Sequence, residues 1–123
     1  MKKILVVDDD PLIVDVIAEK LKTSGYEVLK ATDGVEAVRL AKASQPDLII
    51  LDLLMPIMGG AGAVIALKED KKTKKIPIFF LTGADLSEDE LKRDHVGADH
   101  IFHKPFSLQE LMDKIRDILA KKR

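Results

Sequence analysis

The feature that most limits the fold of this chain is a fivefold alternation between short aliphatic runs and longer segments with helical spacing. The runs are rich in Val, Ile and Leu and are too short for helices. Such alternation is typical of a parallel sheet whose strands are joined by helices that pack on it, so an α/β fold is predicted. The expected strands are Lys3–Val7, Glu27–Ala31, Leu48–Leu51, Ile78–Leu81 and Ala98–Phe102, and the expected helices are Pro11–Ser24, Gly34–Ser44, Gly60–Asp70, Ser87–Val96 and Ser107–Lys121.

Several helix boundaries carry chemical signals of their own. Pro11 suits the first turn of a helix, because its missing N–H would have no partner there, and Gly25 suits the position just after the end. Asp10, which precedes Pro11, is expected to be the N-cap of that helix rather than a metal ligand. Three further helix starts place a capping side chain before an acid that can reach back, and these caps are Asp33, Ser87 and Ser107.

The length and composition favour one globular domain over residues 1–123. A chain of 123 residues can bury one hydrophobic core, and 46% hydrophobic with 33% charged residues is an ordinary globular balance. The longest uncharged stretch, Leu53 to Leu67, is interrupted by Pro56 and glycines and is too short to span a membrane. The N-terminus runs into a predicted strand without the apolar region of a signal peptide, which favours a cytoplasmic location.

The charge and cysteine content exclude several kinds of site. Without cysteine, the chain can have no disulfide, thiol nucleophile or thiolate metal site. A formal net charge of -1 provides no overall field to attract nucleic acid. The basic run Lys68–Lys75 lacks interleaved aromatic residues, so it is interpreted as a solvated loop at the end of a helix. No direct binding of nucleic acid and no membrane insertion are expected.

Polar and charged residues follow four of the five predicted strands. The string ILVVDDD (residues 4–10) ends in three acids, and LIILD (residues 48–52) ends in another. Because the carboxyl ends of parallel strands meet at one edge of a sheet, where ligands bind, these residues should converge there. The residues expected at this edge are Asp8, Asp9, Asp10, Asp52, Thr82 and Lys104.

Carboxylates gathered in this way require a cation. Held within about 5 Å of each other, they repel strongly unless positive charge is present. Mg²⁺ suits hard oxygen ligands and commonly binds one or two carboxylates together with phosphate. One acid could then attack phosphorus, while Lys104 neutralises phosphoryl oxygens and Thr82 donates a hydrogen bond. The edge is therefore predicted to be a magnesium-dependent phosphoryl acceptor.

Four strings in order also resemble a known family: ILVVDDD, DLIILDLLMPIMGG, IPIFFLTG and GADHIFHKPF. At these separations they are similar to the receiver domain of two-component response regulators (CheY-like), over essentially the whole chain. The resemblance implies a five-stranded parallel sheet of order 2-1-3-4-5, flanked by five helices in a flavodoxin-like, doubly wound arrangement. It implies a signalling module rather than an enzyme, whose only reactions are its own phosphorylation and dephosphorylation.

The resemblance also implies roles for individual residues. Asp52 would be the phosphorylated residue, and Thr82 and Lys104 would contact the phosphoryl group. The implied Mg²⁺ ligands are Asp8, Asp9, Asp52 and the main-chain carbonyl of Leu54. The phosphoryl group would come from a histidine kinase, a histidine phosphotransfer protein or a small donor such as acetyl phosphate. A downstream effector would bind the face formed by the fourth helix, fifth strand and fifth helix, and the chain would be a monomer or a weak phosphorylation-dependent dimer.

Two positions depart from the usual family pattern, Ile101 and Gly59, and at Gly59 members commonly carry Asp. Ile101 stands three residues before the lysine, where members usually carry an aromatic residue whose rotation accompanies switching. Leu54 and Ala84, which flank the site by resemblance, cannot orient water by hydrogen bonding, so slow self-dephosphorylation is expected. Ile101 leaves open the alternative of a docking module that keeps the receiver fold without phosphorylation.

Two other functional classes fit less well. An aspartyl-phosphate phosphatase would use the Asp-x-Asp within residues 8–10, but Pro11 follows where that family has a loop, and 123 residues leave no room for a substrate cap. A flavodoxin-like flavin carrier would need hydroxyls and glycine where this chain has acids. Whether an output domain follows Arg123 in a longer regulator, or the chain acts alone, is left open by the sequence.

Overall fold

The computed structural model describes residues 1–52, 59–82, 98–103 and 106–121. In chain order the elements are β1 (Lys3–Val7), α1 (Pro11–Thr23), β2 (Glu27–Ala31), α2 (Gly34–Ser44), β3 (Leu48–Asp52), α3 (Gly59–Glu69), β4 (Ile78–Thr82), β5 (Ala98–His103) and α5 (Leu108–Lys121). Each boundary lies within one residue of the predicted range. The helix predicted at Ser87–Val96 lies outside the described residues.

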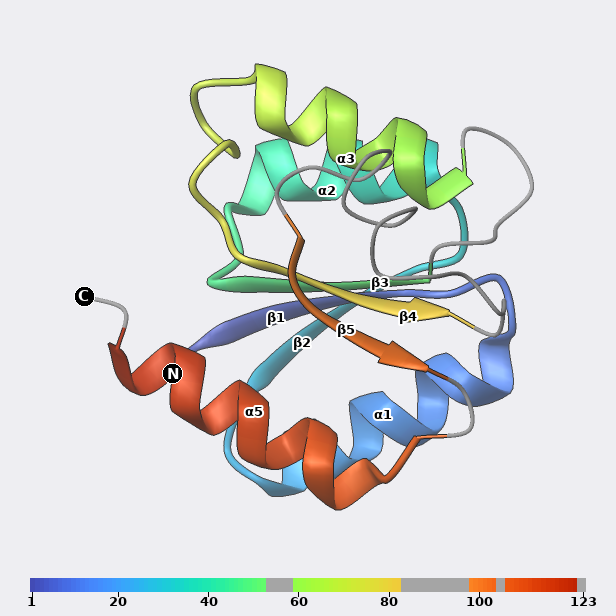
Figure 1. Ribbon diagram of the computed structural model, residues 1–123, viewed down its shortest axis with the longest axis vertical. Helices are drawn as coiled ribbons and strands as arrows, with labels where there is room; N and C mark the ends of the chain where they lie inside the picture. The colour runs from blue at the N-terminus through green and yellow to red at the C-terminus, as the bar shows by residue number, and fades with distance from the viewer. Residues whose placement is uncertain (53–58, 83–97, 104–105, 122–123) are drawn as a thin grey trace.

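The five strands form one parallel sheet in the order β2-β1-β3-β4-β5, which confirms the predicted order. In Figure 1 the strands run the same way, so their carboxyl ends meet at one edge of the sheet. Val7 at the end of β1 is in register with Ala31 of β2 and Leu51 of β3. The register then places Asp52 beside Leu81 of β4. The last residues of neighbouring strands are therefore adjacent in space.

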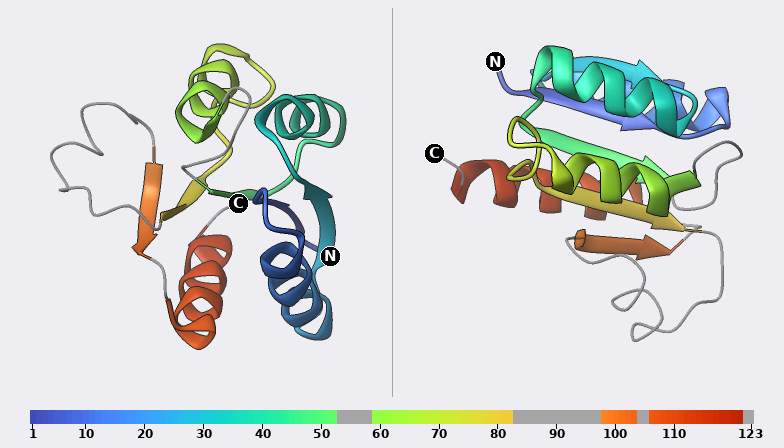
Figure 2. Two further views of the ribbon diagram at one scale, coloured as in Figure 1. Left: turned by 90° about the vertical axis from the view of Figure 1, so that its right-hand side faces the viewer. Right: turned by 90° about the horizontal axis from the view of Figure 1, so that it is seen from above.

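Alternating strand residues divide the core between the two faces of the sheet. Figure 2 shows α2 and α3 on one face and α1 and α5 on the other. In β1, Leu5 and Val7 pack toward α2 and α3, while Ile4 and Val6 pack toward α1 and α5. Because both faces are covered, β1, β3 and β4 carry runs of apolar residues instead of alternating with polar ones. No helix in the described part of the chain is long and apolar enough to cross a membrane.

The helix ends confirm most of the predicted caps. Asp10 caps α1 by accepting from the Leu12 N–H at 3.0 Å, and Asp33 caps α2 by accepting from the Glu36 N–H at 2.8 Å. The Glu110 N–H donates to the Ser107 hydroxyl at 3.2 Å. Gly25, just past the end of α1, has φ +96°, which a side chain would strain. The cap predicted at Ser87 lies outside the described residues.

One part of the lysine-rich run differs from the solvated loop predicted for it. Thr73 is fully buried, and its hydroxyl donates to the main-chain carbonyl of Leu67 at 2.6 Å. The loop from α3 must return under that helix to enter β4, where Ile76 and Pro77 are also buried. The composition of the run predicted that all of its side chains are exposed to solvent. The return of the chain beneath α3 instead buries Thr73.

Candidate functional site

The first acid of the candidate site is Asp8, which follows β1 directly. Its side chain is completely buried. The main-chain N–H of Asp8 donates to the Ala31 carbonyl at 3.3 Å, which extends the pairing of β1 with β2 by one residue. The N–H of Asp10 donates to Asp8 Oδ1 at 3.0 Å and so orients the carboxylate. Asp8 is thus held at the end of the strand by the turn that starts α1.

The second acid, Asp52, is the last residue of β3. It is 3% exposed, so the carboxylate is almost entirely shielded from water by the protein. Since β3 lies between β1 and β4, Asp52 projects from the centre of the sheet edge. Burial of an ionised carboxylate is costly unless other groups or ions stabilise it. A position of this kind is therefore unusual for an acid that serves only the fold.

Asp8, Asp9 and Asp52 form one acidic cluster. Each contributes a carboxylate oxygen, and these oxygens lie within 4.8 Å of one another. Asp8 and Asp52 are buried, whereas Asp9 is exposed and opens the cluster to solvent. The convergence expected from the two aliphatic runs is therefore present in the structure.

The neighbouring acid, Asp10, has a different task. Its carboxylate caps α1 through the Leu12 N–H, and its own N–H donates to Asp8. The sequence predicted the cap but missed the bond to Asp8. An aspartate can accept from the main-chain N–H two residues on in an Asx turn, so Asp8 just after a strand is the signal that could have revealed the bond.

The other predicted site residues are described only in part. The main chain of Thr82 ends β4 at the same edge and is in register with His103 of β5. The side chain of Thr82 is outside the described part of the chain, as are Leu54 and Lys104. Lys104 follows β5 directly in the sequence, and Leu54 stands two residues after Asp52. Their predicted roles in the site stay predictions.

The chemistry of the acidic cluster suits a hard divalent cation. Three carboxylates provide only oxygen donors, the ligands that Mg²⁺ prefers. At the usual Mg–O distance of about 2.1 Å, two oxygens on opposite sides of one ion are about 4.2 Å apart. Oxygens within 4.8 Å of each other can meet that requirement after small side-chain rotations. The residues present therefore fit a magnesium ion.

Comparison with known proteins agrees with this geometry. The family model described as "Response regulator receiver domain" matches residues 4–116. The receiver domain of the Francisella response regulator 1452 has a TM-score of 0.90 and 28% identity, with all of both chains covered. The receiver domain of the sensor histidine kinase PA1611 from Pseudomonas aeruginosa, solved with a magnesium ion coordinated in its active-site cleft, has a TM-score of 0.85 and 30% identity. That match covers 94% of this chain and 95% of the other.

A curated relative shows how much of a longer protein the chain matches. The DNA-binding dual master transcriptional regulator RpaA of Synechocystis is 37% identical over 121 residues, which are 98% of this chain and 50% of RpaA. The chain thus spans about half the length of the curated relatives it matches.

Proposed function

Because the chain belongs to the family of response regulator receiver domains, we propose that it is the phosphoacceptor of a two-component system and that Asp52 receives the phosphoryl group. A receiver domain is a signalling module rather than a classical enzyme. The observation that carries the proposal is the acidic cluster, in which Asp52 ends the central strand β3 with Asp8 and Asp9 beside it. We propose further that residues 1–123 form a single receiver domain.

The proposed reaction transfers one phosphoryl group to a carboxylate. An oxygen of Asp52 attacks phosphorus and forms a new O–P bond. The N–P bond of a phosphohistidine, or the O–P bond between acetate and phosphorus in acetyl phosphate, breaks, and its electron pair leaves with the imidazole or the acetate. Bound Mg²⁺ would neutralise charge on the phosphoryl oxygens. Asp8 and Asp9 would hold the ion, with the Leu54 carbonyl as a further ligand.

The acidic cluster explains why a cation would be needed. Without one, the three carboxylates would repel an incoming phosphoryl group, which is itself an anion. The roles that we propose for Lys104 and Thr82 rest on their positions in the sequence. Lys104, directly after β5, would bind the transferred group through its ammonium, and the Thr82 hydroxyl would donate a hydrogen bond to it.

The partners follow from this chemistry. A receiver domain implies a histidine kinase, or a histidine phosphotransfer protein, as the phosphoryl source. We propose that a downstream effector binds the face that includes β5 and α5, and that the chain is a monomer or a weak phosphorylation-dependent dimer. The curated relative RpaA is a DNA-binding regulator of twice the length, so any output through DNA would require a further domain.

The experiment that tests the proposal is the intact mass of the chain after incubation with acetyl phosphate and Mg²⁺. We expect a gain of one phosphoryl group in the native chain and none in Asp52→Asn. Chelation of the metal should also prevent the gain. Asp47→Asn is the matched control, because Asp47 lies just before the same strand at its other end and should leave the reaction unchanged.

Two results would contradict the proposal. A gain that persists in Asp52→Asn would place the phosphoryl group on another residue. No gain from acetyl phosphate or from phosphorylated histidine kinases would favour the alternative of a docking module that keeps the receiver fold without phosphorylation.

A further inference from the structure

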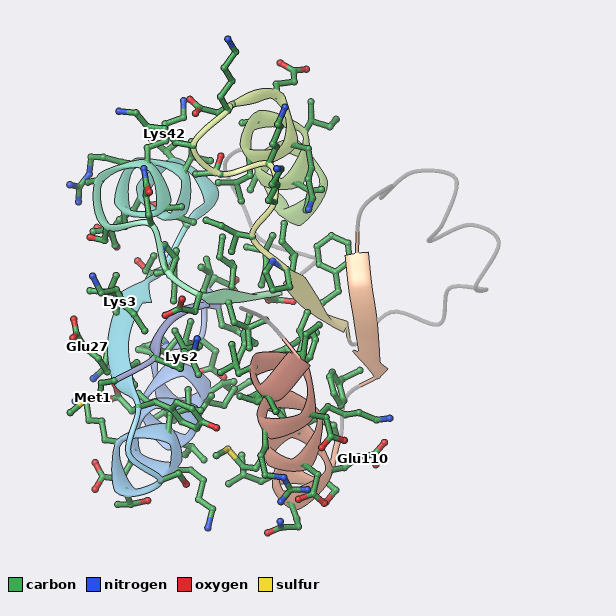
Figure 3. All side chains as sticks on the ribbon, turned by 90° about the vertical axis from the view of Figure 1, so that its left-hand side faces the viewer. Met1, Lys2, Lys3, Glu27, Lys42 and Glu110 are labelled. Atoms are coloured by element: carbon green, nitrogen blue, oxygen red, sulfur yellow. The ribbon has the colours of Figure 1, made fainter. Side chains whose placement is uncertain are left out.

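The loop between α3 and β4, residues 70–77, carries a basic surface that phosphoryl transfer does not explain. This lysine loop precedes β4 and so lies at the amino ends of the strands, opposite the edge that holds Asp52. A five-residue strand of about 3.3 Å per residue separates the two by roughly 17 Å. Figure 3 looks onto the amino ends of the strands and labels Lys42 of α2, whose side chain reaches the loop. The run Lys68–Lys75 contains five lysines and two acids.

The lysine loop is folded onto the protein by hydrogen bonds. The carbonyl of Asp70 accepts from the N–H groups of Thr73 at 3.1 Å and Lys74 at 2.9 Å. The carboxylate of Asp70 accepts from the Lys72 N–H at 2.7 Å. The buried Thr73 hydroxyl anchors the centre of the loop to α3. The backbone that presents the lysines is thereby fixed in advance of any binding event.

Two lysines stabilise the lysine loop through contacts of their own side chains. Lys42 forms an ion pair with Asp70 at 3.5 Å. The Lys68 ammonium donates to the carbonyls of Lys74 at 3.2 Å and Ile76 at 3.3 Å. Their positive charges are therefore used within the fold.

Three other lysines of the loop are exposed and are not held by an ion pair of this kind. Lys71, Lys74 and Lys75 make no side-chain ion pair with any residue that the structure describes. All three belong to a five-residue segment whose backbone is held by hydrogen bonds. Like charges placed so close together repel each other, and a ligand of opposite charge would relieve that repulsion.

We propose that the lysine loop binds an acidic segment of a partner polypeptide, independently of the chemistry at Asp52. The Asp70 carbonyl accepts from both Thr73 and Lys74, so Lys71 to Lys75 form a compact turn that a short peptide segment could contact. A specific DNA interface buries about 1,000 Å² or more, and the acidic remainder of this chain would repel a long polyanion. Among residues 68–75 there is no arginine for bidentate phosphate contacts and no aromatic ring for stacking on bases.

The test is fluorescence anisotropy with a labelled peptide of eight glutamates, titrated with the 123-residue chain at low salt. The loop variant is the triple substitution Lys71→Gln, Lys74→Gln and Lys75→Gln. Three exposed ion pairs, each worth about twofold in affinity, predict a loss of about eightfold. The matched control is Lys20→Gln, Lys22→Gln and Lys114→Gln, which removes the same charge from α1 and α5 on the other face of the sheet. The control should bind the peptide within about twofold of the native chain.

A second pair of variants tests whether the folding of the loop matters. Thr73→Val keeps every lysine but removes the hydroxyl that anchors the loop, and we expect it to weaken peptide binding by several-fold. Thr73→Ser retains the hydroxyl and should restore the affinity. If the native chain, Thr73→Val and Thr73→Ser bind the peptide with equal affinity, the ordered backbone of the loop does not contribute to binding. That result would contradict the proposal that the surface is preorganised.

Other outcomes would overturn the proposal outright. Equal losses in the two triple variants would show a response to overall charge rather than to this loop. Absence of peptide binding would also overturn the proposal. Binding of a 20-base-pair duplex, or of vesicles containing about one third phosphatidylserine, would not rescue it. Asp52→Asn should bind the peptide as the native chain does, so this test can fail or succeed separately from phosphorylation.

Discussion

The two ends of the sheet treat their acidic residues in opposite ways. At the amino ends of the strands, Asp47 accepts from the Lys3 N–H at 2.8 Å, and Glu27 lies 4.0 Å from the Lys3 ammonium. Asp70 is paired with Lys42 at 3.5 Å. At the carboxyl ends, three carboxylates gather within 4.8 Å of each other, two of them buried. The acids at the amino ends are therefore spread out beside separate partners, whereas the acids at the carboxyl ends lie close to one another.

The difference shows where acidic residues serve folding and where they serve a ligand. The acids at the amino ends have their partners within the molecule. The acidic cluster brings three carboxylates close together, and a bound cation would lower their mutual repulsion. Local rules of stability are typically broken at functional sites. Variants at the two ends of the sheet test this contrast.

Mg²⁺ should stabilise the chain strongly. At a concentration 100-fold above its Kd, the ion should raise the free energy of unfolding by about 2.7 kcal/mol, because it binds only the folded state. Asp8→Asn removes one carboxylate charge from the cluster and should abolish most of this gain. Urea unfolding with and without Mg²⁺ measures both values.

The amino end of the sheet supplies the control for this measurement. Asp47→Asn removes a carboxylate charge but keeps an oxygen that can accept from the Lys3 N–H. Its response to Mg²⁺ should equal that of the native chain. If Asp8→Asn responds to Mg²⁺ as strongly as the native chain does, Asp8 is not a ligand, and the contrast between the two ends loses its basis.

The next effect concerns the acid that ties the start of β1 to the start of β3. Asp47→Ala leaves the half-buried Lys3 N–H without its acceptor, at a cost of about 1–3 kcal/mol in the free energy of unfolding. Asp47→Asn should recover most of that loss. The comparison by urea unfolding is made without divalent cations. Equal stability of the alanine and asparagine variants would show that the hydrogen bond contributes little.

Sequence reasoning succeeded where the physics is periodic or local. Runs such as ILVV predict buried strands, and the caps at Asp10 and Asp33 depend on residues only a few positions away. The meeting of Asp8 with Asp52 was also predictable, because parallel strands bring their carboxyl ends to one edge.

What the sequence could not reveal depends on the path of the chain in three dimensions. Thr73 stands among lysines, and its burial follows from how the loop returns beneath α3. The bond from Lys3 to Asp47 joins residues 44 apart and requires the finished register of β1 and β3. Burial of Asp8 with exposure of Asp9 was likewise not readable from three consecutive identical residues.

A smaller effect on the free energy of unfolding is expected at Asp10, which caps α1 and is not part of the acidic cluster. Asp10→Ala removes the side-chain cap of α1 and should cost about 1 kcal/mol. The main-chain N–H that orients Asp8 is retained, so stabilisation by Mg²⁺ should be unchanged. Asp10→Ser restores a capping oxygen and should restore the stability. Loss of the Mg²⁺ response in both variants would instead make Asp10 part of the metal site.

The smallest effect is a pH dependence at the amino end of the sheet. The Lys72 N–H that donates to Asp70 holds the pKa of that carboxyl below its ordinary value of 3.8, and the Lys42 ammonium adds to the shift. Because the pKa is lowered in the folded state, the stabilisation is fully present above 3.8 and is lost as the pH falls through the lower folded value. Carboxyl titration by NMR should locate that value directly.

Unfolding across the same acidic range tests the sign of the Asp70 effect. The stability advantage of the native chain over Asp70→Asn should shrink as the pH falls, without a change at neutral pH. Added salt should weaken the part due to Lys42, which lies 3.5 Å away in a partly exposed pair, and spare the part due to the Lys72 N–H. An advantage that grows in acid would mean that Asp70 is not stabilised as an anion. The contrast with the acidic cluster, where three carboxylates lie close together, would then lose part of its basis.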